Sequence, residues 1–449
     1  MTLVAVTFFL LMLVGMPIGY VLGIAGLVGM WTIDPSGRFF PMAAERFFAG
    51  LDLFTFLAMP FFIFAGEIMN RSGITDRLIG LADALVGYLR GGMAHSNMVA
   101  SVMFAGLSGA ATADAAAFGN TLVPAMVKKG YTRPFSCAVT AAGSIIGPTI
   151  PPSNLMIIYG SLMGVSIAGL FAAGILPGLL ICAVCMAVIR LGANRFKLPP
   201  AEGRLSLWRI VVAFKDGFAA LLMPVMILGG ILAGAVTPTE AASIAVFYAL
   251  VMGAFVYRKV GWADLNEMLI RTARITGIVF LIIASASILG WWMTFNQLPQ
   301  AIAAGFLAVS ENPAGIIARL LFIGMFMDIN AMLIILAPVL APLAASIGMD
   351  PVHAGIMIVL ALNISLMTPP VGACLFVLAS VTGERIERIA KALWPFLLAE
   401  VAILFAVAYI PELTLFVPRL LGLTQRVSCA ARLRGAPPPA LPPIPSDKA

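Results

Sequence analysis

The sequence predicts a polytopic membrane protein made of α-helices, and two observations carry that prediction. Hydrophobic residues make up 61% of the 449 residues and charged residues only 10%, whereas soluble domains average about 45–50% and about 25%. The hydrophobic residues also gather in long unbroken runs, unlike the short alternating segments of an outer-membrane barrel. This composition excludes a soluble domain, a fibrous protein or a secreted disulfide scaffold for most of the chain.

About ten of these runs are long enough to cross the ~30 Å hydrocarbon core of a bilayer as helices, although the first two are short. We place them at 2–14, 17–31, 51–69, 134–160, 168–190, 216–235, 239–257, 274–295, 352–381 and 392–416. Two further apolar regions, 94–129 and 313–347, carry Gly, Asn, Asp and Pro where a simple span would carry Leu. We expect each of them to form a re-entrant helical hairpin.

An internal repeat divides the chain into two halves. Seven Gly, Pro and Phe positions recur at one offset of 218 residues: Phe104 with Phe322, Gly106 with Gly324, Pro124 with Pro342, Gly130 with Gly348, Pro151 with Pro369, Pro152 with Pro370, and Pro177 with Pro395. Five crossings per half make the halves inverted relative to each other, as in many secondary transporters. The predicted division is 1–190 (first repeat), 191–215 (connector), 216–418 (second repeat) and 419–449, a Pro-rich tail expected to be disordered.

Basic residues between the spans predict the orientation. One connector carries Arg190, Arg195, Lys197, Arg204, Arg209 and Lys215, and a second loop carries Arg258, Lys259, Arg271 and Arg274. By the positive-inside rule both are cytoplasmic. Counting outward from them places both termini on the periplasmic side of a bacterial inner membrane.

Four stretches interrupt the predicted helices at membrane depth: 106–110, 144–152, 324–330 and 363–370. Irregular backbone is tolerated there only where protein buries it or where it lines a cavity. The freed carbonyls, with Ser, Thr and Asn oxygens, suit a hard monovalent cation. The N-terminal ends of the resumed half-helices suit an anionic substrate. The residues that we place near the substrate are Asp114, Asn120, Pro151, Pro152, Asn330, Asn363, Pro369 and Pro370.

Acidic residues inside the apolar regions are candidates for function because a charge near the bilayer centre costs at least ~2.5 kcal/mol. Asp114 follows the first hairpin tip, and Asp328 lies in the second. Both either balance cations or cap a half-helix. Glu67 ends a span, where solvation at the interface is expected, and Glu240 follows Pro238, which predicts a helix N-terminus.

Enzyme chemistry has no support in the sequence. The only histidines, His95 and His353, are expected at loop edges and make no metal cluster, and no phosphate-binding Gly-Lys-Ser/Thr loop occurs. Cys182 and Cys185 form a C-x-x-C motif inside a predicted span, where Cys usually acts as a small hydrophobe. We expect no cofactor, and no metal other than sodium as a coupling ion.

Several motifs together resemble one family, the large membrane subunit (DctM-like) of tripartite ATP-independent periplasmic, or TRAP, transporters. The resemblance covers about residues 3–418. Its carriers are the stretches 15–18, 59–67, 104–109, 146–153, 237–241, 324–328 and 366–372.

The resemblance implies a sodium-coupled importer of organic acid anions with an elevator-type mechanism, in which a transport domain slides against a scaffold. It implies two partners, a small membrane subunit (DctQ-like) and a periplasmic substrate-binding protein (DctP-like). C4-dicarboxylates are the default substrate. The family's cation sites would fall on Ser108, Gly109, Ser144, Gly147, Thr149, Gly324, Asp328, Ser365 and Thr368. Ala110 stands where many members carry a small polar residue, so that side chain is no ligand here.

Two alternatives remain open from the residues alone. A stand-alone sodium–dicarboxylate symporter would share the architecture and need no binding protein. A membrane enzyme or channel is the third candidate. The lack of catalytic clusters disfavours an enzyme, and two closed hairpins disfavour an open pore.

Overall fold

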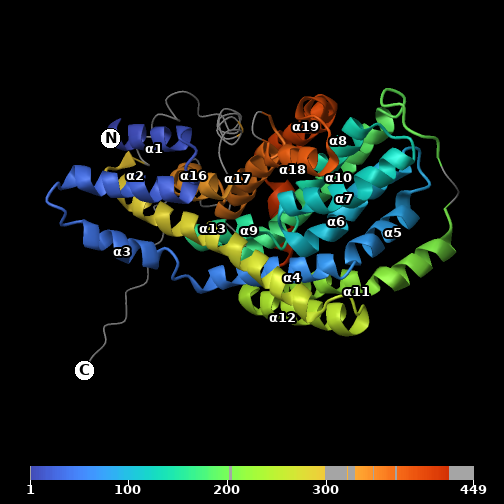
Figure 1. Cartoon of the computed structure of the whole chain (residues 1–449), viewed down its shortest axis with the longest axis horizontal. Coiled ribbons are helices and arrows are strands. Elements are labelled where there is room, and N and C mark those ends of the chain that lie inside the picture. Colours follow the sequence, from blue (N-terminus) through green and yellow to red (C-terminus); the bar gives the residue numbers. More distant parts are fainter. Residues whose placement is uncertain are drawn as a thin grey trace, which may run out of the picture.

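The computed structural model describes residues 2–201, 205–298, 321, 329–346, 348–369 and 372–423, and these ranges contain helices and no strand (Figure 1). The helices are α1 (Thr2–Leu13), α2 (Ile18–Ile33), α3 (Phe40–Ala49), η1 (Phe54–Leu57), α4 (Ala58–Arg71), α5 (Ile74–Val86), α6 (Gly92–Ser108), α7 (Ala111–Lys128), α8 (Arg133–Ser144), α9 (Asn154–Met163), α10 (Ile167–Leu191), α11 (Leu207–Leu232), α12 (Pro238–Val251), η2 (Met252–Val256), α13 (Trp262–Phe295), α16 (Ile329–Ser346), α17 (Pro351–Ser365), α18 (Ala373–Thr382), α19 (Ile386–Tyr409) and α20 (Glu412–Leu420).

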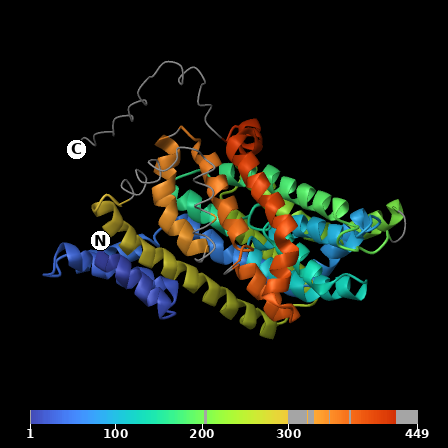
Figure 2. The same cartoon turned by 90° about the horizontal axis from the view of Figure 1, so that it is seen from above.

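One long helix, α13, forms a diagonal strut along one side of the molecule (Figures 1 and 2). Helix α2 packs along it through glycines spaced three or four residues apart. A Cβ atom on Gly26 would lie 2.9 Å from the backbone nitrogen of Leu289, and one on Gly29 would lie 2.7 Å from Cγ of Trp292. Such close approach replaces the hydrophobic effect as the source of helix association in lipid.

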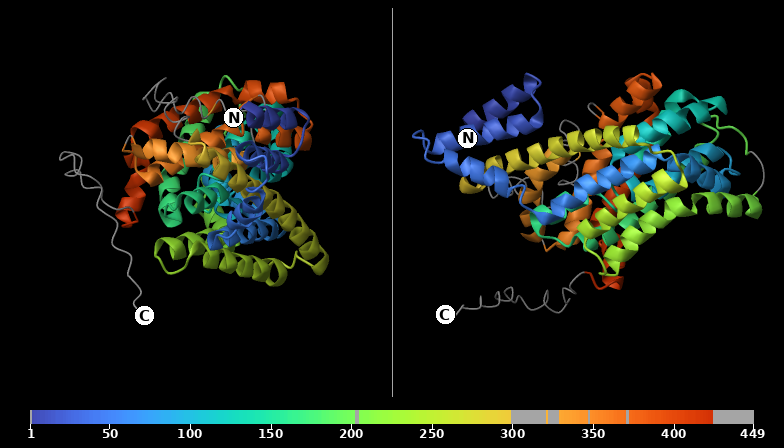
Figure 3. Two further views of the ribbon diagram at one scale, coloured as in Figure 1. Left: turned by 90° about the vertical axis from the view of Figure 1, so that its left-hand side faces the viewer. Right: turned by 60° about the horizontal axis from the view of Figure 1, so that its bottom comes forward.

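Helices α4, α5, α11 and α12 continue this side, and α11 and α12 lie side by side along its lower edge (Figures 1 and 3). The bent pair α3 and η1–α4 turns by 58°. We call the group α1–α5 and α11–α13 the outer group. It touches the rest of the molecule closely at Gly106 of α6, where a Cβ atom would lie 2.4 Å from Cβ of Pro224 in α11.

The remaining described helices, α6–α10 and α16–α20, make up the inner group. It holds the first hairpin and both interrupted spans. Helices α6 and α7 form a helix–turn–helix over the range expected for the first hairpin, with Gly109 and Ala110 at the turn. Helices α8 and α9 are separated by an irregular stretch at 145–153, and α17 and α18 by one whose described residues are 366–369 and 372. Both predicted breaks are therefore present. In the second hairpin region, residues 313–320 and 322–328 lie outside the described part of the chain.

The helix bounds follow the offset seen in the sequence. Adding 218 to the bounds of α7 gives those of α16, and the same shift brings α8, α9 and α10 to within three residues of α17, α18 and α19. This correspondence supports the internal repeat. The inverted orientation of the two halves in a membrane stays a prediction.

Several boundaries differ from the sequence prediction. Five helices of the described part are long and apolar enough to cross a bilayer, or six with the bent pair, against about ten predicted spans. Spans 134–160 and 352–381 are each two short helices, and α1 and α2 are short as expected. The amphipathic helices α3 and α5 were missed because their apolar residues do not form a continuous run.

Charged segments also fold further into helices than expected. Arg271 and Arg274 lie within the 34-residue α13 and not in a loop, and α11 begins at Leu207 inside the predicted connector. The last span ends at Tyr409, and α20 runs past the expected start of the tail. His95 and His353 are buried in helices, contrary to the expected loop edges. Glu240 closes a capping box with Thr237, as its position after Pro238 predicts.

The glycine contact between α2 and α13 can be tested by stability. Gly26→Val places a branched side chain against the Leu289 backbone, and we expect a loss of about 1–3 kcal/mol because backbone cannot move aside cheaply. Gly277→Val is the matched control, since nothing lies within 4 Å of a Cβ atom at that exposed α13 position. Thermal unfolding of the two purified variants measures the difference. Equal melting temperatures would contradict the packing described here.

Candidate functional site

The turn of the first hairpin rests directly on the first break. Gly109 ends α6 with a φ of +60°, a left-handed conformation that glycine adopts without strain. A Cβ atom on it would lie 2.5 Å from the carbonyl oxygen of Pro152. Only glycine therefore fits. Pro152, joined to Pro151 by a cis peptide bond, is buried under the turn.

A buried carboxyl group marks the same contact. Asp114 is fully buried in the first turn of α7, where the helix dipole favours negative charge. A Cβ atom on Gly147 would lie only 2.0 Å from Asp114 Oδ2. The glycine thus leaves room for the carboxylate between the hairpin and the break. This position of Asp114 fits both roles that the sequence left open, capping of α7 and balancing of a cation's charge.

Four hydroxyl groups at or next to the breaks donate to backbone carbonyls three or four residues earlier in the chain. Ser144 donates to the carbonyl of Ala141 at 2.7 Å and Thr149 to that of Ile145 at 2.8 Å. Ser365 and Thr368 repeat the pattern in the second break, at 2.6 and 2.8 Å. Each hydroxyl hydrogen is donated in this way, so the hydroxyl oxygen can act only as an acceptor toward other groups. Such oxygens can serve a hard cation.

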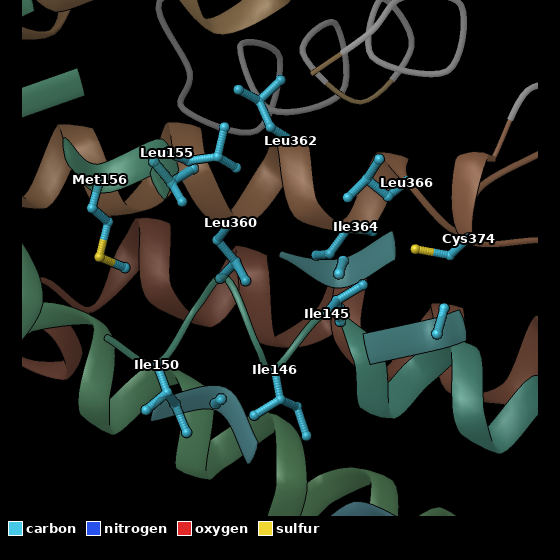
Figure 4. Close-up of a cluster of buried hydrophobic side chains, with 14 of the residues drawn as sticks. Ile145, Ile146, Ile150, Leu155, Met156, Leu360, Leu362, Ile364, Leu366 and Cys374 are labelled. Carbon is cyan, nitrogen blue, oxygen red and sulfur yellow. The ribbon is translucent and has the colours of Figure 1, made fainter. Parts of the chain in front are cut away.

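One hydrogen bond joins the two breaks. Asn363 Nδ2 donates to Thr149 Oγ1 at 3.1 Å, and both side chains are buried. Apolar residues from both spans pack around the breaks, and Figure 4 shows Ile145, Ile146, Ile364 and others of this cluster. This bond therefore holds together two segments that lie 214 residues apart in the chain.

A cavity of about 290 Å³ opens beside this junction. Helices α4 and α13 form one wall, and the hairpin turn, both breaks and the start of α16 form the others. Three helices begin at its edge: α7 at Ala111, α9 at Asn154 and α18 at Ala373. The polar side chains of its described lining are Glu67, Asn70, Thr112, Asn154 and Asn330.

The structure gathers most of the predicted site residues within this region. Gly109 and Asn330 line the cavity. The breaks contain Gly147, Thr149, Pro151, Pro152, Thr368 and Pro369, and Asp114 lies against the first of them. Ser144 ends α8 beside the first break, and Asn363 and Ser365 lie at the end of α17 beside the second. Asn120 is exposed on α7 and is not among the lining residues. Gly324, Asp328 and Pro370 lie outside the described residues, as does the side chain of Ser108.

The sequence analysis missed the contribution of the outer group. Glu67 was expected to be solvated at an interface, but it lines the cavity from α4, and its Oε1 lies 3.2 Å from Nε of Arg271 on α13. The pairing joins residues 204 positions apart in the chain, so no local pattern reveals it. The family motif at 59–67, which ends at Glu67, is the signal in the sequence that points to this side chain.

These features define the class of protein to which the chain belongs. The chain is a multi-pass helical membrane protein whose interrupted helices meet at a cavity, and secondary transporters build their sites in this way. A family model described as "Tripartite ATP-independent periplasmic transporter, DctM component" matches residues 5–413. The chain belongs to this family. Its members are transporter permease subunits and not enzymes.

Curated relatives match along nearly their whole length. The chain is 40% identical to "Uncharacterized protein YgiK" of Salmonella typhimurium, covering 92% of this chain and 96% of that protein. It is 38% identical to the sialic acid TRAP transporter large permease protein SiaM of Vibrio cholerae, covering 92% and 98%. It is 37% identical to the C4-dicarboxylate TRAP transporter large permease protein DctM of Pseudomonas aeruginosa, covering 90% and 95%.

Two solved structures share the fold at low identity. The YdaH transporter of Alcanivorax borkumensis superposes with a TM-score of 0.57 at 16% identity, covering 87% of this chain and 90% of that one. MtrF of Neisseria gonorrhoeae gives 0.53 at 14% identity, covering 83% of each chain. Both likenesses concern the arrangement of helices alone.

The contact between hairpin and break can be tested at Gly147. Gly147→Ala places a methyl group onto the Asp114 carboxylate, and we expect a loss of about 1–3 kcal/mol because two buried elements must separate. Gly80→Ala is the control, since nothing lies within 4 Å of its Cβ position in α5. Thermal unfolding provides the measurement. If the two variants melt together, the hairpin does not rest on the break as described.

Proposed function

We propose that this chain is the membrane pathway of a tripartite importer of organic acid anions, driven by sodium entry. It would work with a small membrane subunit and with a periplasmic protein that delivers the substrate. The family supports the tripartite assembly. The remaining steps rest on the cavity and its surroundings.

The convergence of helix N-termini on the cavity carries the proposal for an anion. The first turns of α7, α9 and α18 all reach it. Backbone N–H groups and the positive ends of helix dipoles bind carboxylates without a cationic side chain. Glu67 is the one charged residue in the described lining, and it is paired with Arg271. The substrate charge would thus meet helix ends and not a fixed arginine.

Sodium would balance that charge beside the cavity. The hydroxyl oxygens of Ser144, Thr149, Ser365 and Thr368 retain lone pairs at the breaks, although that of Thr149 also accepts a hydrogen bond from Asn363. Asp114 adds a carboxylate in the first repeat. Oxygen donors of this kind are the ligands that hard cations prefer. Binding of the cation would draw the hairpin and the break together, so that an empty site and a loaded site differ in packing.

The position of the cavity supports an elevator movement. Its walls come from the outer group on one side, through α4 and α13, and from the inner group on the other. A substrate held there lies at the boundary between the two groups. Sliding of the inner group along the outer group would carry the substrate across the membrane. We retain the predicted orientation, with both termini periplasmic and the basic connector after α10 cytoplasmic.

The helix N-termini at the cavity support an organic acid anion as the substrate class, and they do not select a particular acid. Relatives of similar identity carry names that refer to sialic acid or to C4-dicarboxylates. A C4-dicarboxylate is the first substrate to test, and specificity would rest largely with the binding protein. A stand-alone sodium–dicarboxylate symporter remains the alternative.

Uptake into liposomes separates these two mechanisms. The chain and its small subunit are reconstituted, and dicarboxylate uptake is measured with and without binding protein and with and without an inward sodium gradient. We expect uptake only when both are present, because delivery and driving force are separate requirements. Uptake with sodium but without binding protein would establish the simple symporter instead.

The cation role of the second break is tested at Thr368. Removing its hydroxyl in Thr368→Ala should weaken sodium binding, so uptake falls several-fold at limiting sodium and recovers toward the native rate at saturating sodium. Ser380→Ala is the matched control, because its exposed hydroxyl makes the same bond to its own helix. An equal loss at every sodium concentration would remove Thr368 from the cation site.

A further inference from the structure

A second buried carboxyl group lies well away from the cavity. Glu400 is at the middle of α19 within an apolar run, and its side chain is fully buried. It takes no part in the cavity lining or in the breaks. Charged groups at membrane depth are costly and usually mark a functional site, so this carboxyl needs a physical account.

The two oxygens of Glu400 have unequal surroundings. Oε1 accepts a hydrogen bond from the thiol of Cys185 on α10, with a sulfur–oxygen distance of 3.6 Å. Oε2 has no hydrogen-bond partner among the described residues. No Lys, Arg or His within the described ranges forms an ion pair with this side chain. A carboxylate in this position would leave its charge uncompensated inside apolar packing.

None of the charged groups on the neighbouring helices forms an ion pair with Glu400 within the described ranges. Helix α10 supplies Cys185, Cys182 one turn earlier and Arg190 in its last turn, and α18 supplies Cys374, which also contacts Ser144. On α8 the titratable side chains are Arg133 and Cys137, and Cys137 faces Thr382 and Glu384 at the end of α18. On α17 His353 binds Thr414 of α20 instead. The first turns of α19 itself carry Glu387, Arg388 and Lys391.

The internal repeat shows that this buried carboxyl group has no counterpart in the first half of the chain. The offset of 218 residues brings Glu400 onto Cys182 in α10, so the two repeats place a carboxyl and a thiol at equivalent positions of packed helices. A structural requirement for a polar group in this helix pair would be met by a thiol on both sides. The carboxyl exists in one repeat only, which points to a task that a thiol does not perform.

A metal ion fits these ligands poorly. A hard cation such as sodium needs several oxygen donors, and Glu400 offers one unpartnered oxygen next to a sulfur atom. A proton satisfies the same site with a single O–H bond. It neutralises the carboxyl and needs no further ligand.

We propose that Glu400 and Cys185 form a proton-binding site inside the inner group, with the proton on Oε2 of Glu400 in the conformation described here. The thiol proton of Cys185 stays on sulfur and is shared with Oε1. When the packing of α10 against α19 loosens, the carboxyl releases its proton to water, and it must regain one before this conformation reforms. Proton concentration therefore biases the conformational equilibrium of the permease.

Infrared spectroscopy tests the proton directly and needs no transport. The full chain with its small subunit is placed in lipid nanodiscs at about pH 7. We expect a carbonyl band of a protonated carboxylic acid that disappears in Glu400→Gln and persists in Glu387→Gln, an exposed carboxyl on the same helix. In Cys185→Ala the band should move to higher frequency, because the hydrogen bond to Oε1 is lost. A band unchanged by Glu400→Gln would overturn the proposal, as would an unshifted band in Cys185→Ala.

Uptake across a range of pH tests the consequence and rests on the proposed function. With sodium and binding protein saturating, uptake by the native protein should fall several-fold between about pH 6 and about pH 9, whereas uptake by Glu400→Gln should stay level. A parallel pH profile for the two proteins would refute the dependence of uptake on the Glu400 proton. Absence of uptake by any protein would count against the proposed importer, and the infrared result would still decide the proton site.

Discussion

An interrupted helix inside a membrane is the constraint on which this structure depends. Backbone groups freed at the two breaks find no water in lipid, so other protein segments must cover them. The hairpin turn at Gly109 covers the first break, and the bond from Asn363 to Thr149 fixes the breaks against each other. The cavity, the helix N-termini at its edge and the free hydroxyl oxygens all follow from that arrangement.

Glycine allows two different kinds of close contact in the fold. Along α2 it lets a helix approach the long strut α13 closely, which favours a stable outer group. At Gly109 and Gly147 it lets a turn and a carboxylate approach a break, where the contacts are polar and few. The first kind of contact holds the outer group together, and the second holds the hairpin against the break within the inner group.

The few charges at membrane depth are handled in three ways. Asp114 sits at a helix N-terminus beside the break, and Glu67 is paired with Arg271 across the outer group. Glu400 has only a thiol beside it, within a fully apolar setting. The first two arrangements stabilise a carboxylate, whereas the third stabilises a neutral acid. Under the two proposals made above, sodium and protons would act through separate groups.

The sequence by itself determined the class of protein, the position of both breaks, the first hairpin and the repeat, because these depend on local composition and on prolines and glycines that cannot continue a helix. The resemblance to the family is the reason for proposing cation sites at the breaks. Only the tertiary structure decided which polar groups meet. Glu67 meets Arg271, Asn363 meets Thr149, and Glu400 points into the core and not toward lipid. Each of these facts depends on how helices far apart in the chain rotate and pack, and an apolar run does not encode which of its faces lies inside.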